Sequence, residues 1–315
     1  MDEYKHVPVL ANEAIDLLNI KPNGIYIDCT LGGGGHSSLI LQKLTTGLLI
    51  GIDQDEYAIK RATERLSKIN DRFVIVKDNF VNIRSIVNEL KLTHVDGILY
   101  DLGVSSFQFD IPERGFSYQH DAYLDMRMDQ SQTLDAHYII NNYSESELRR
   151  CFFEYGEEKF SPQIARAIIK ERNTKPIDTT FELVEVVKKA LPASVLRQKG
   201  HPAKQVFQAL RIEVNQELSV FKKSLEDAFD IISVNGVIAV ITFHSLEDRI
   251  CKKAFKEKVT LDLPKGLPFI PSGYEISFEL LTTKAITASD NELKINNRAH
   301  SAKLRAIKRI QQKAH

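Results

Sequence analysis

The chain has 315 residues, with 42 Lys and Arg against 42 Asp and Glu, so its formal net charge is zero. This balance excludes a histone-like protein that coats nucleic acid through bulk positive charge. Hydrophobic residues make up 43% of the chain and charged residues 27%, which is typical of a globular protein rather than a disordered one. The longest apolar run, residues 237–243, is far shorter than the ~20 residues that cross a bilayer, so no membrane segment is expected.

The cysteines and the first ten residues indicate the cellular compartment of the protein. Cys29, Cys151 and Cys251 are odd in number and widely spaced, which is typical of a reducing compartment and fits neither a disulfide framework nor a zinc knuckle. Residues 1–10 contain an early acidic pair and no long apolar core, so they do not resemble a signal peptide. We therefore expect a cytoplasmic protein.

The first third of the chain alternates short apolar runs, which predict strands, with longer amphipathic runs, which predict helices. The expected strands are residues 25–30, 48–52, 73–76 and 95–99, and the helices between them are residues 37–44 and 56–69. This alternation predicts right-handed parallel crossovers and a doubly wound α/β sheet of the Rossmann-like type. Such sheets bind ligands beyond the carboxyl ends of their strands.

The pattern changes near residue 111. Residues 145–155, 162–172 and 180–190 are expected to be helices, and a strand is expected again only at residues 236–243. One long helix is predicted before that strand by hydrophobic residues at helical spacing, namely Val206, Leu210, Val214, Leu218 and Leu225. The simplest interpretation is one sheet domain, residues 1–110 and 203–315, interrupted by a helical insertion, residues 111–202.

The end of the chain is basic. From residue 294 onward it has no acidic residue and seven cations, namely Lys294, Arg298, Lys303, Arg305, Lys308, Arg309 and Lys313. On a neutral protein this tail is a candidate contact for a polyanion. The alternative is a solvated C-terminal helix or a frayed end.

A glycine cluster, residues 32–35, stands between the first expected strand and helix. Glycines there let the backbone approach a ligand closely, with N–H groups at the helix start facing it. The cluster alone is weak evidence, because tight turns use glycine for steric reasons. Asp53 strengthens it, because an acid at the end of the next strand, ~20 residues beyond the loop, binds ribose hydroxyls. The pattern indicates a site for an adenosine-type nucleoside.

The residues around the loop narrow the choice of nucleoside. His36 follows the last glycine where a P-loop has lysine, which excludes that route to ATP, and a dinucleotide fingerprint fits only loosely. Asp28 would repel a pyrophosphate but suits the ammonium and sulfonium groups of S-adenosylmethionine. The segment ending at Phe80 is placed to reach the adenine, and Asp101 faces the side where a substrate would enter.

Two further motifs favour structural roles. His244 and Ser245 are neighbours whose side chains point opposite ways on a strand, which argues against a Ser–His dyad. A helix cap from Ser245 to Asp248 is favoured over metal binding by His244 and Asp248. Residues 103–107 lack the closing glycine of a nucleophile elbow, so a hydrolase is not expected.

Asp121, Asp125 and Asp129 recur at helical spacing. Arg114 and Arg127 lie near enough to pair with them, and such a mixed face is more often a set of ion pairs than a metal site. We therefore predict no metal.

Several blocks together resemble a known family. They are residues 6–10, 32–37, 101–106, 113–117, 124–129, 155–158, 201–203, 207–212 and 243–249. Through them the chain is similar, over nearly its whole length, to the bacterial methyltransferases that modify N4 of a cytosine in 16S rRNA. Phe107 stands where this family usually has proline, and His300 where it usually has a second arginine.

The resemblance implies an enzyme that methylates N4 of one cytidine in the decoding centre of 16S rRNA, within the small ribosomal subunit, with S-adenosylmethionine as cofactor. It implies a Rossmann-like methyltransferase sheet and makes the helical insertion the expected substrate-recognition domain. The cofactor contacts it implies are Gly34, Gly35, His36, Asp53, Phe80, Asp101 and Gln108. Residue reasoning alone had reached all of these regions except Gln108.

Methylation of the target amine needs a hydrogen-bond acceptor near it, because the lone pair of that amine is delocalised into the cytosine ring. Amino-methyltransferases often have an Asp-Pro-Pro-aromatic loop after the fourth strand, whereas residues 101–104 contain neither proline nor an aromatic. We expect Asp101 to be the catalytic acceptor. Phe107, Phe109 and Phe116 are candidates to stack on an extruded cytosine, with ordinary packing as the alternative.

Other readings stay open. RNA contacts are expected at the basic tail and at a cluster of Arg197, Lys199, Lys204 and Arg211. A methyltransferase acting on DNA or protein is the nearest alternative. A nicotinamide-dependent oxidoreductase and a non-catalytic RNA-binding factor are more distant, and the sequence does not decide whether the chain forms a homodimer.

Overall fold

The computed structural model describes residues 8–260 and 276–311, with the side chains of residues 106 and 107 left out. The chain forms two compact units, one of residues up to Gly103 and from Leu218 onward, and one of Val104–Glu217. Each unit is described by itself. No helix in the described part of the chain is long and apolar enough to cross a membrane.

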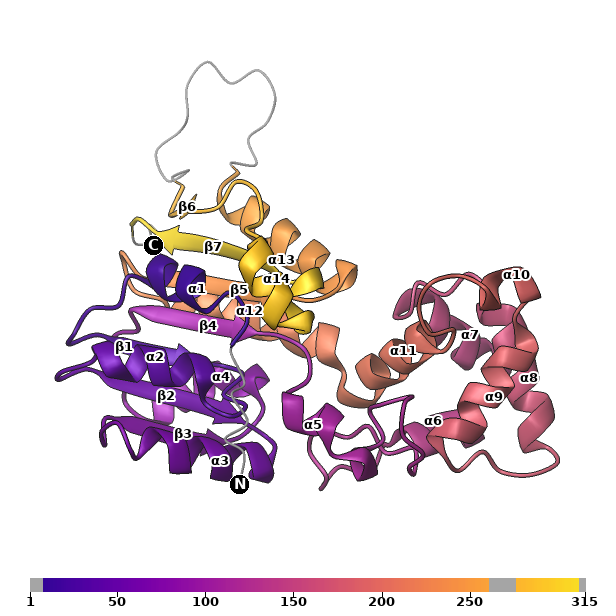
Figure 1. The fold of residues 1–315 in the computed structure, drawn as a ribbon. Coiled ribbons are helices and arrows are strands. Elements are labelled where there is room, and N and C mark those ends of the chain that lie inside the picture. Colours follow the sequence, from indigo (N-terminus) through magenta and orange to yellow (C-terminus); the bar gives the residue numbers. More distant parts are fainter. Residues whose placement is uncertain (1–7, 261–275, 312–315) are drawn as a thin grey trace, which may run out of the picture. The chain divides into compact units, whose positions relative to one another are not determined.

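The first unit is built on a sheet whose described strands are ordered β3-β2-β1-β4-β5-β7-β6 (Figure 1). Five of the described strands run parallel to one another: β1 (Ile25–Asp28), β2 (Leu48–Asp53), β3 (Phe73–Lys77), β4 (Gly97–Asp101) and β5 (Val237–Thr242). β7 (Lys303–Arg309) runs antiparallel between β5 and β6 (Phe278–Leu280). Because β1 has β2 on one side and β4 on the other, the connections diverge there, and ligands bind at such a switch point. The α/β fold class predicted from the sequence is confirmed.

Helices cover both faces of this sheet. One face packs α1 (Ala11–Leu18), α2 (Gly35–Lys43) and α3 (Glu56–Leu66), and the other packs α4 (Ile83–Glu89), α12 (Glu217–Ile231) and α13 (Ser245–Lys258). In β5, Ile238 and Val240 join one apolar cluster while Ala239 and Ile241 join the other. A strand buried on both sides has no polar face, which is why these strands are continuous apolar runs in the sequence.

The expected strands and helices of the first third are present, with ends shifted by a few residues. β4 extends to Asp101, so the last residues of β1, β2 and β4 are Asp28, Asp53 and Asp101. Side chains at the carboxyl ends of parallel strands gather at one edge of the sheet. Three acids therefore stand where a ligand is expected.

The C-terminal region is not the solvated helix or frayed end considered from the sequence. It contains α14 (Asp290–Ile295), η3 (Asn297–Ser301) and the strand β7. Leu304, Ala306 and Ile307 are fully buried in β7, while the charged residues between them hide the apolar alternation. Part of the basic tail, Lys303–Arg309, is thus an internal strand of the sheet, and Lys313 lies outside the described residues.

The second unit is helical, as predicted. Its α7 (Glu145–Glu154), α8 (Ser161–Arg172) and α9 (Thr180–Ala190) match the three expected helices closely. The remaining short elements of the chain are η1 (Phe80–Asn82), α5 (Ser106–Asp110), η2 (Pro112–Arg114), α6 (Ala136–Asn142) and α10 (Ala193–Leu196). Helices α7, α8 and α9 begin with serine or threonine close to their first turn, and capping boxes at Ser144 and Thr179 fix α7 and α9.

The long helix predicted before β5 is wrong in one respect, because it is two helices. α11 (Lys204–Asn215) ends at Gln216, whose φ of 50° breaks the helical path before α12 begins. Val206, Leu210 and Val214 of α11 are buried in the core of the second unit, where α11 packs on α6 and α7. The unit boundaries therefore fall at 103/104 and 217/218 rather than at 110/111 and 202/203, because helical periodicity does not say which core a helix joins.

Candidate functional site

The glycine loop between β1 and α2 has a backbone that other residues adopt at a cost. Gly32 and Gly34 have φ angles of 49° and 74°. A Cβ atom on Gly34 would lie 3.3 Å from the Cβ of Ala62, so a side chain at position 34 would have both a strained torsion and a tight contact. The chain then enters α2 at Gly35, and the loop and the first turn of that helix present backbone N–H groups at the sheet edge.

Asp53 joins the end of β2 to this loop. Its Oδ2 accepts a hydrogen bond from the backbone N–H of Gly32 at 2.8 Å, and its Oδ1 accepts one from that of Asp55 at 2.9 Å. Burial raises the pKa of Asp53 to about 6, while these two hydrogen bonds oppose the rise. Each carboxylate oxygen has a further lone pair, so the side chain that shapes the loop can still accept from ribose hydroxyls.

His36, in the first turn of α2, connects the N-terminal segment to Asp101. Its ring is 5% exposed, and its Nε2 lies 3.0 Å from the carbonyl oxygen of Val9. A carbonyl oxygen only accepts, so Nε2 carries the hydrogen in this contact. The other ring nitrogen, Nδ1, lies 3.4 Å from Oδ2 of Asp101. The structure therefore places two residues predicted for the site in contact.

Asp101, at the end of β4, has one buried carboxylate oxygen that lacks a partner. Its backbone N–H donates to Thr30 Oγ1 at 2.7 Å, and Oδ2 faces His36. Oδ1 has no hydrogen-bond partner among the described residues. Such an atom is costly to leave unpaired in a folded protein, and at a ligand edge it indicates a place for a bound donor.

The charges around Asp101 set its pKa, which is raised to about 6. Burial is the largest cause. His36 and Arg298 oppose it by favouring the ionised form, whereas Asp28 and Glu247 add to it by repulsion. At neutral pH the side chain is therefore mainly a carboxylate, which can accept a hydrogen bond, and it gains a proton in mildly acidic solution.

Asp28 has a different place from the one expected for a partner of the cofactor's cationic groups. It is 1% exposed, and burial raises its pKa. Its Oδ2 accepts from Ser37 Oγ at 2.7 Å and its Oδ1 from the backbone N–H of Thr30 at 3.2 Å. Asp28 thus ties the end of β1 to α2 and supports the loop from within.

Phe80 lies beyond β3 at the same edge, at the start of η1. Its position is fixed by Asn79, whose side chain accepts from the N–H of Val81, and by its own carbonyl, which accepts from Ser224 Oγ at 2.8 Å. The ring packs edge-on against Tyr100, with 5.7 Å between centroids. Gln108 belongs to α5 of the second unit, where its Oε1 accepts a hydrogen bond from the N–H of Ser105.

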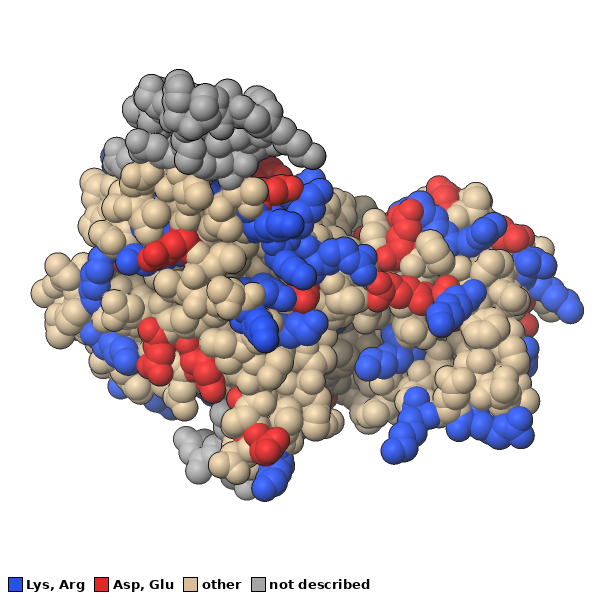
Figure 2. All heavy atoms as spheres, turned by 90° about the horizontal axis from the view of Figure 1, so that it is seen from above, with Lys and Arg blue, Asp and Glu red and all other residues tan. Residues whose placement is uncertain are grey.

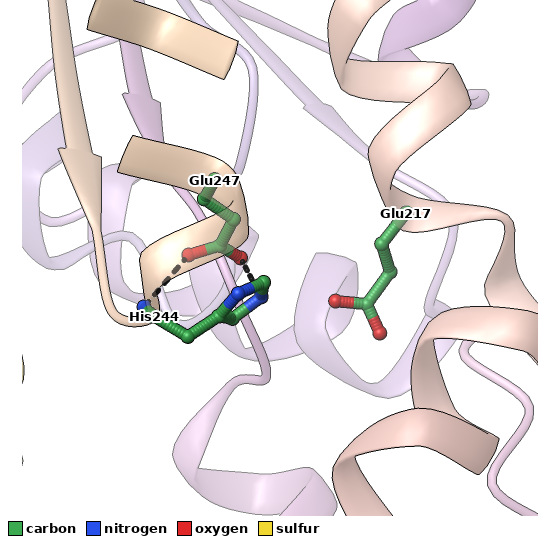
Figure 3. A group of neighbouring side chains, drawn as sticks. All are labelled: Glu217, His244 and Glu247. Carbon is green, nitrogen blue, oxygen red and sulfur yellow. Dashed lines mark hydrogen bonds and ion pairs between the residues drawn. The ribbon is translucent and has the colours of Figure 1, made fainter. Parts of the chain in front are cut away.

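His244 and Glu247 follow β5 and form the start of α13, where the sequence predicted a cap from Ser245 to Asp248. The residue that caps α13 is His244 rather than Ser245, and Oε2 of Glu247 accepts from the N–H groups of Phe243 and His244. The other oxygen of Glu247 lies 3.0 Å from His244 Nε2 (Figure 3). Asp248 instead pairs with Lys303 and Arg305 of β7. The helix begins one residue earlier than predicted, and this start makes Glu247 its third residue, the position of the acid in a capping box.

Several expected contacts of the second unit are used internally. Arg127 pairs with Asp125, as predicted, whereas Arg114 donates to the carbonyls at positions 127 and 128. Arg211, placed in an RNA-binding cluster from the sequence, forms an ion pair with Glu217 through two hydrogen bonds. Figure 3 draws the side chain of Glu217 but not that of Arg211. Phe116 is buried in the helical core, Phe109 packs against it, and the side chain of residue 107 lies outside the described part.

Known proteins resemble the chain to different degrees. The MraW methylase family matches residues 3–310. A protein from Exiguobacterium sibiricum, called ribosomal RNA small subunit methyltransferase H, is 54% identical over 98% of this chain and 99% of its own. A solved rRNA methylase from Streptococcus thermophilus is 12% identical, with a TM-score of 0.42 over 96% of this chain and 94% of its own. A SAM-dependent O-methyltransferase from Thermotoga maritima is 10% identical, with a TM-score of 0.41 over 97% of this chain and 66% of its own.

Proposed function

Because the chain belongs to the MraW methylase family, we propose that it methylates N4 of a cytidine in the decoding centre of 16S rRNA. Family membership confirms two predictions from the sequence, namely methyltransferase activity and S-adenosylmethionine as the methyl donor. Family membership also excludes the alternative function of a nicotinamide-dependent oxidoreductase. The choice of rRNA over DNA or protein is supported by the relative from Exiguobacterium sibiricum, whose name states that substrate.

The residues at the sheet edge fit the cofactor on two observations. The backbone at Gly34 has a torsion that favours glycine, as expected of a loop whose backbone contacts a ligand, and Asp101 has an unpartnered oxygen. We assign the cofactor contacts to Gly34, Gly35, His36, Asp53, Phe80, Asp101 and Gln108. Within this set Asp53 accepts from the ribose hydroxyls, and Phe80 lies against the adenine. When bound, the cofactor supplies an electrophilic methyl group.

The single observation that carries the mechanism is the free Oδ1 of Asp101. Cytosine N4 is a weak nucleophile because its lone pair is delocalised into the ring. A carboxylate that accepts a hydrogen bond from this amine favours a pyramidal nitrogen and holds it in line for attack, and positioning of this kind can contribute ~7–11 kcal/mol. Asp101 is therefore the catalytic residue of the proposal, and the proton that N4 loses on methylation leaves through the acceptor or to solvent.

The helical second unit is the proposed substrate-recognition domain, and the small ribosomal subunit is the proposed partner. A target base has to leave its stack to reach the end of β4, so the substrate is bound with one cytidine extruded. Because bacterial ribosomal subunits are assembled in the cytoplasm, the proposed reaction would take place there.

The test is direct transfer of a labelled methyl group. Small subunits that lack the modification are incubated with the protein and with S-adenosylmethionine carrying a deuterated methyl, and the rRNA is digested for mass spectrometry. The expected result is label on N4 of one cytidine, with Asp101→Asn as a low-activity control that still binds cofactor. Absence of label on RNA, while the cofactor is shown to bind, would overturn the rRNA assignment and favour DNA or protein.

A further inference from the structure

Helix α13 carries a row of basic side chains along one side. Arg249, Lys252, Lys253 and Lys256 are all exposed, and their spacing of three, one and three residues puts them on one helical face. Across seven residues this row, the α13 stripe, extends about 10 Å. Figure 2 shows Lys and Arg side chains gathered over the part of the first unit where α13 and α14 lie.

The lysines of the α13 stripe are poorly neutralised within the described structure. Among the described residues, no carboxylate oxygen lies within 4.0 Å of the ammonium of Lys252 or Lys256, and Lys253 reaches Glu257 only at 3.9 Å. Nearby cations differ in this respect, since Lys303 and Arg305 both pair with Asp248, and Lys308 pairs with Glu279. Three of the seven cations in the basic tail therefore have a carboxylate partner, whereas Lys252 and Lys256 of the stripe have none among the described residues.

An ordinary solvated helix face mixes the two signs of charge, and α3 provides a comparison within the same unit. Its exposed Lys60 stands between Glu56 and Glu64 along the helix, and Glu56 itself pairs with Lys77. The whole chain has zero net charge, so a row of one sign creates a local positive field rather than reflecting a basic protein. Such a field attracts a polyanion through counterion release.

The position of the α13 stripe connects it to the candidate site. α13 starts three residues after β5 ends, and β5 pairs with β4, in which Asp101 is the last residue. The first residue of the stripe, Arg249, lies about one helical turn from that edge of the sheet. A chain of phosphates that passes along the stripe therefore arrives at the edge where the methyl acceptor is held.

We propose that the phosphate backbone of the substrate RNA lies along the α13 stripe, which holds the strand that leads to the target cytidine. The proposal rests on the proposed function. It assigns the main RNA contact of the first unit to α13, rather than to the basic C-terminal segment.

The test compares two triple variants of equal charge change. Lys252→Gln, Lys253→Gln and Lys256→Gln remove the lysines of the stripe, and Lys43→Gln, Lys60→Gln and Lys68→Gln remove three exposed lysines from the opposite face of the sheet. Methylation of small subunits is measured against subunit concentration at several salt concentrations, with cofactor affinity and thermal unfolding of each variant as checks.

For the stripe variant we expect the KM for subunits to rise on the order of 10-fold at 0.15 M salt. Each lost phosphate contact should make the slope of log affinity against log salt concentration shallower by ~0.7, so the loss of three contacts should change this slope by about 2. The control variant should behave as wild type, and kcat and cofactor affinity should be unchanged in both. Equal KM and salt slope in the two variants, with an active wild type, would overturn the α13 proposal alone. A wild type that leaves subunits unmethylated would overturn the proposed function and this inference together.

Discussion

His36 and Asp101 face each other with 3.4 Å between Nδ1 and Oδ2, while the Val9 carbonyl holds the hydrogen of the ring on Nε2. A positive charge on this ring favours the ionised form of the neighbouring carboxylate, so His36 lowers the pKa of Asp101 against the effect of burial. The pair links the protonation of the proposed catalytic carboxylate to the start of α2 and to the N-terminal segment.

The first prediction concerns pH. Because the pKa of Asp101 is raised to about 6, lowering the pH through 6 should protonate the acceptor and reduce the methyl-transfer rate about tenfold per pH unit below that point. Single-turnover transfer at saturating cofactor between pH 5 and 8 measures this limb. Asp101→Asn should have a low rate and no such limb. A wild-type rate that stays constant from pH 5 to 8 would rule out the acceptor role.

The second prediction concerns His36, which lowers the pKa of Asp101 through its charge. His36→Gln keeps a donor for the Val9 carbonyl but removes that charge, so the pKa of Asp101 should rise and the acidic limb of the rate should move to higher pH. The same single-turnover profile measures the shift, and His94→Gln, an exposed histidine, serves as the control. A limb that stays in place while only cofactor affinity falls would show that His36 acts on the cofactor alone.

The third prediction concerns stability. The folded pKa of Asp101, about 6, lies above the unfolded value near 3.8, so the folded state binds more protons and unfolding free energy falls as pH rises from about 4 to 6. Asp101→Asn removes this desolvated charge and should stabilise the protein at pH 7.5 by up to about 3 kcal/mol, with little effect at pH 4. Urea unfolding at both pH values measures the difference. If Asp101→Asn changed the unfolding free energy equally at pH 4 and pH 7.5, burial of the charged form of Asp101 would not destabilise the folded state.

The fourth prediction concerns the glycine loop. Gly34→Ala places a Cβ at a φ of 74° and 3.3 Å from the Cβ of Ala62, which should cost about 1–2 kcal/mol for the torsion alone. Cofactor affinity should fall strongly as the loop shifts. Gly200→Ala is the matched control, because its φ is also positive but no atom lies within 4 Å of the added carbon. Calorimetric titration with cofactor compares them, and equal affinities would remove the loop from the site.

The fifth prediction concerns the C-terminal segment. A chain that stops at Ala302 lacks β7, which pairs along its whole length with β5. Loss of this strand exposes both apolar clusters of the first unit, so cofactor binding and RNA binding should disappear together with the cooperative thermal transition. A chain that stops at Gln311 keeps β7 and should retain all three. Selective loss of RNA binding in the shorter chain would restore the tail as the RNA contact.

The sequence predicted those parts of the fold whose signal is local. β1, β2 and β5 are apolar runs because both of their faces are covered, and their ends position Asp53 and Asp101 predictably. β7 was missed because Lys and Arg interrupt its apolar residues, and these charges find partners only in the folded sheet. Gln108 was reached only through family resemblance. The contact between Val9 and His36 could not be anticipated, since it depends on the path of a segment that has no periodic pattern.

The pairing of β4 with β5 has a consequence for how the protein is made. Gly97 is aligned with Val237, so the two strands that meet beside the proposed catalytic carboxylate are joined by the entire second unit. A ribosome that has produced β1 to β4 has released a half-sheet with one open edge, and it must add the whole helical unit before that edge is closed. Contacts of such long sequence separation form slowly. The strands that are synthesised first, β1 to β4, therefore keep the β4 edge unpaired until the second unit and β5 have been made.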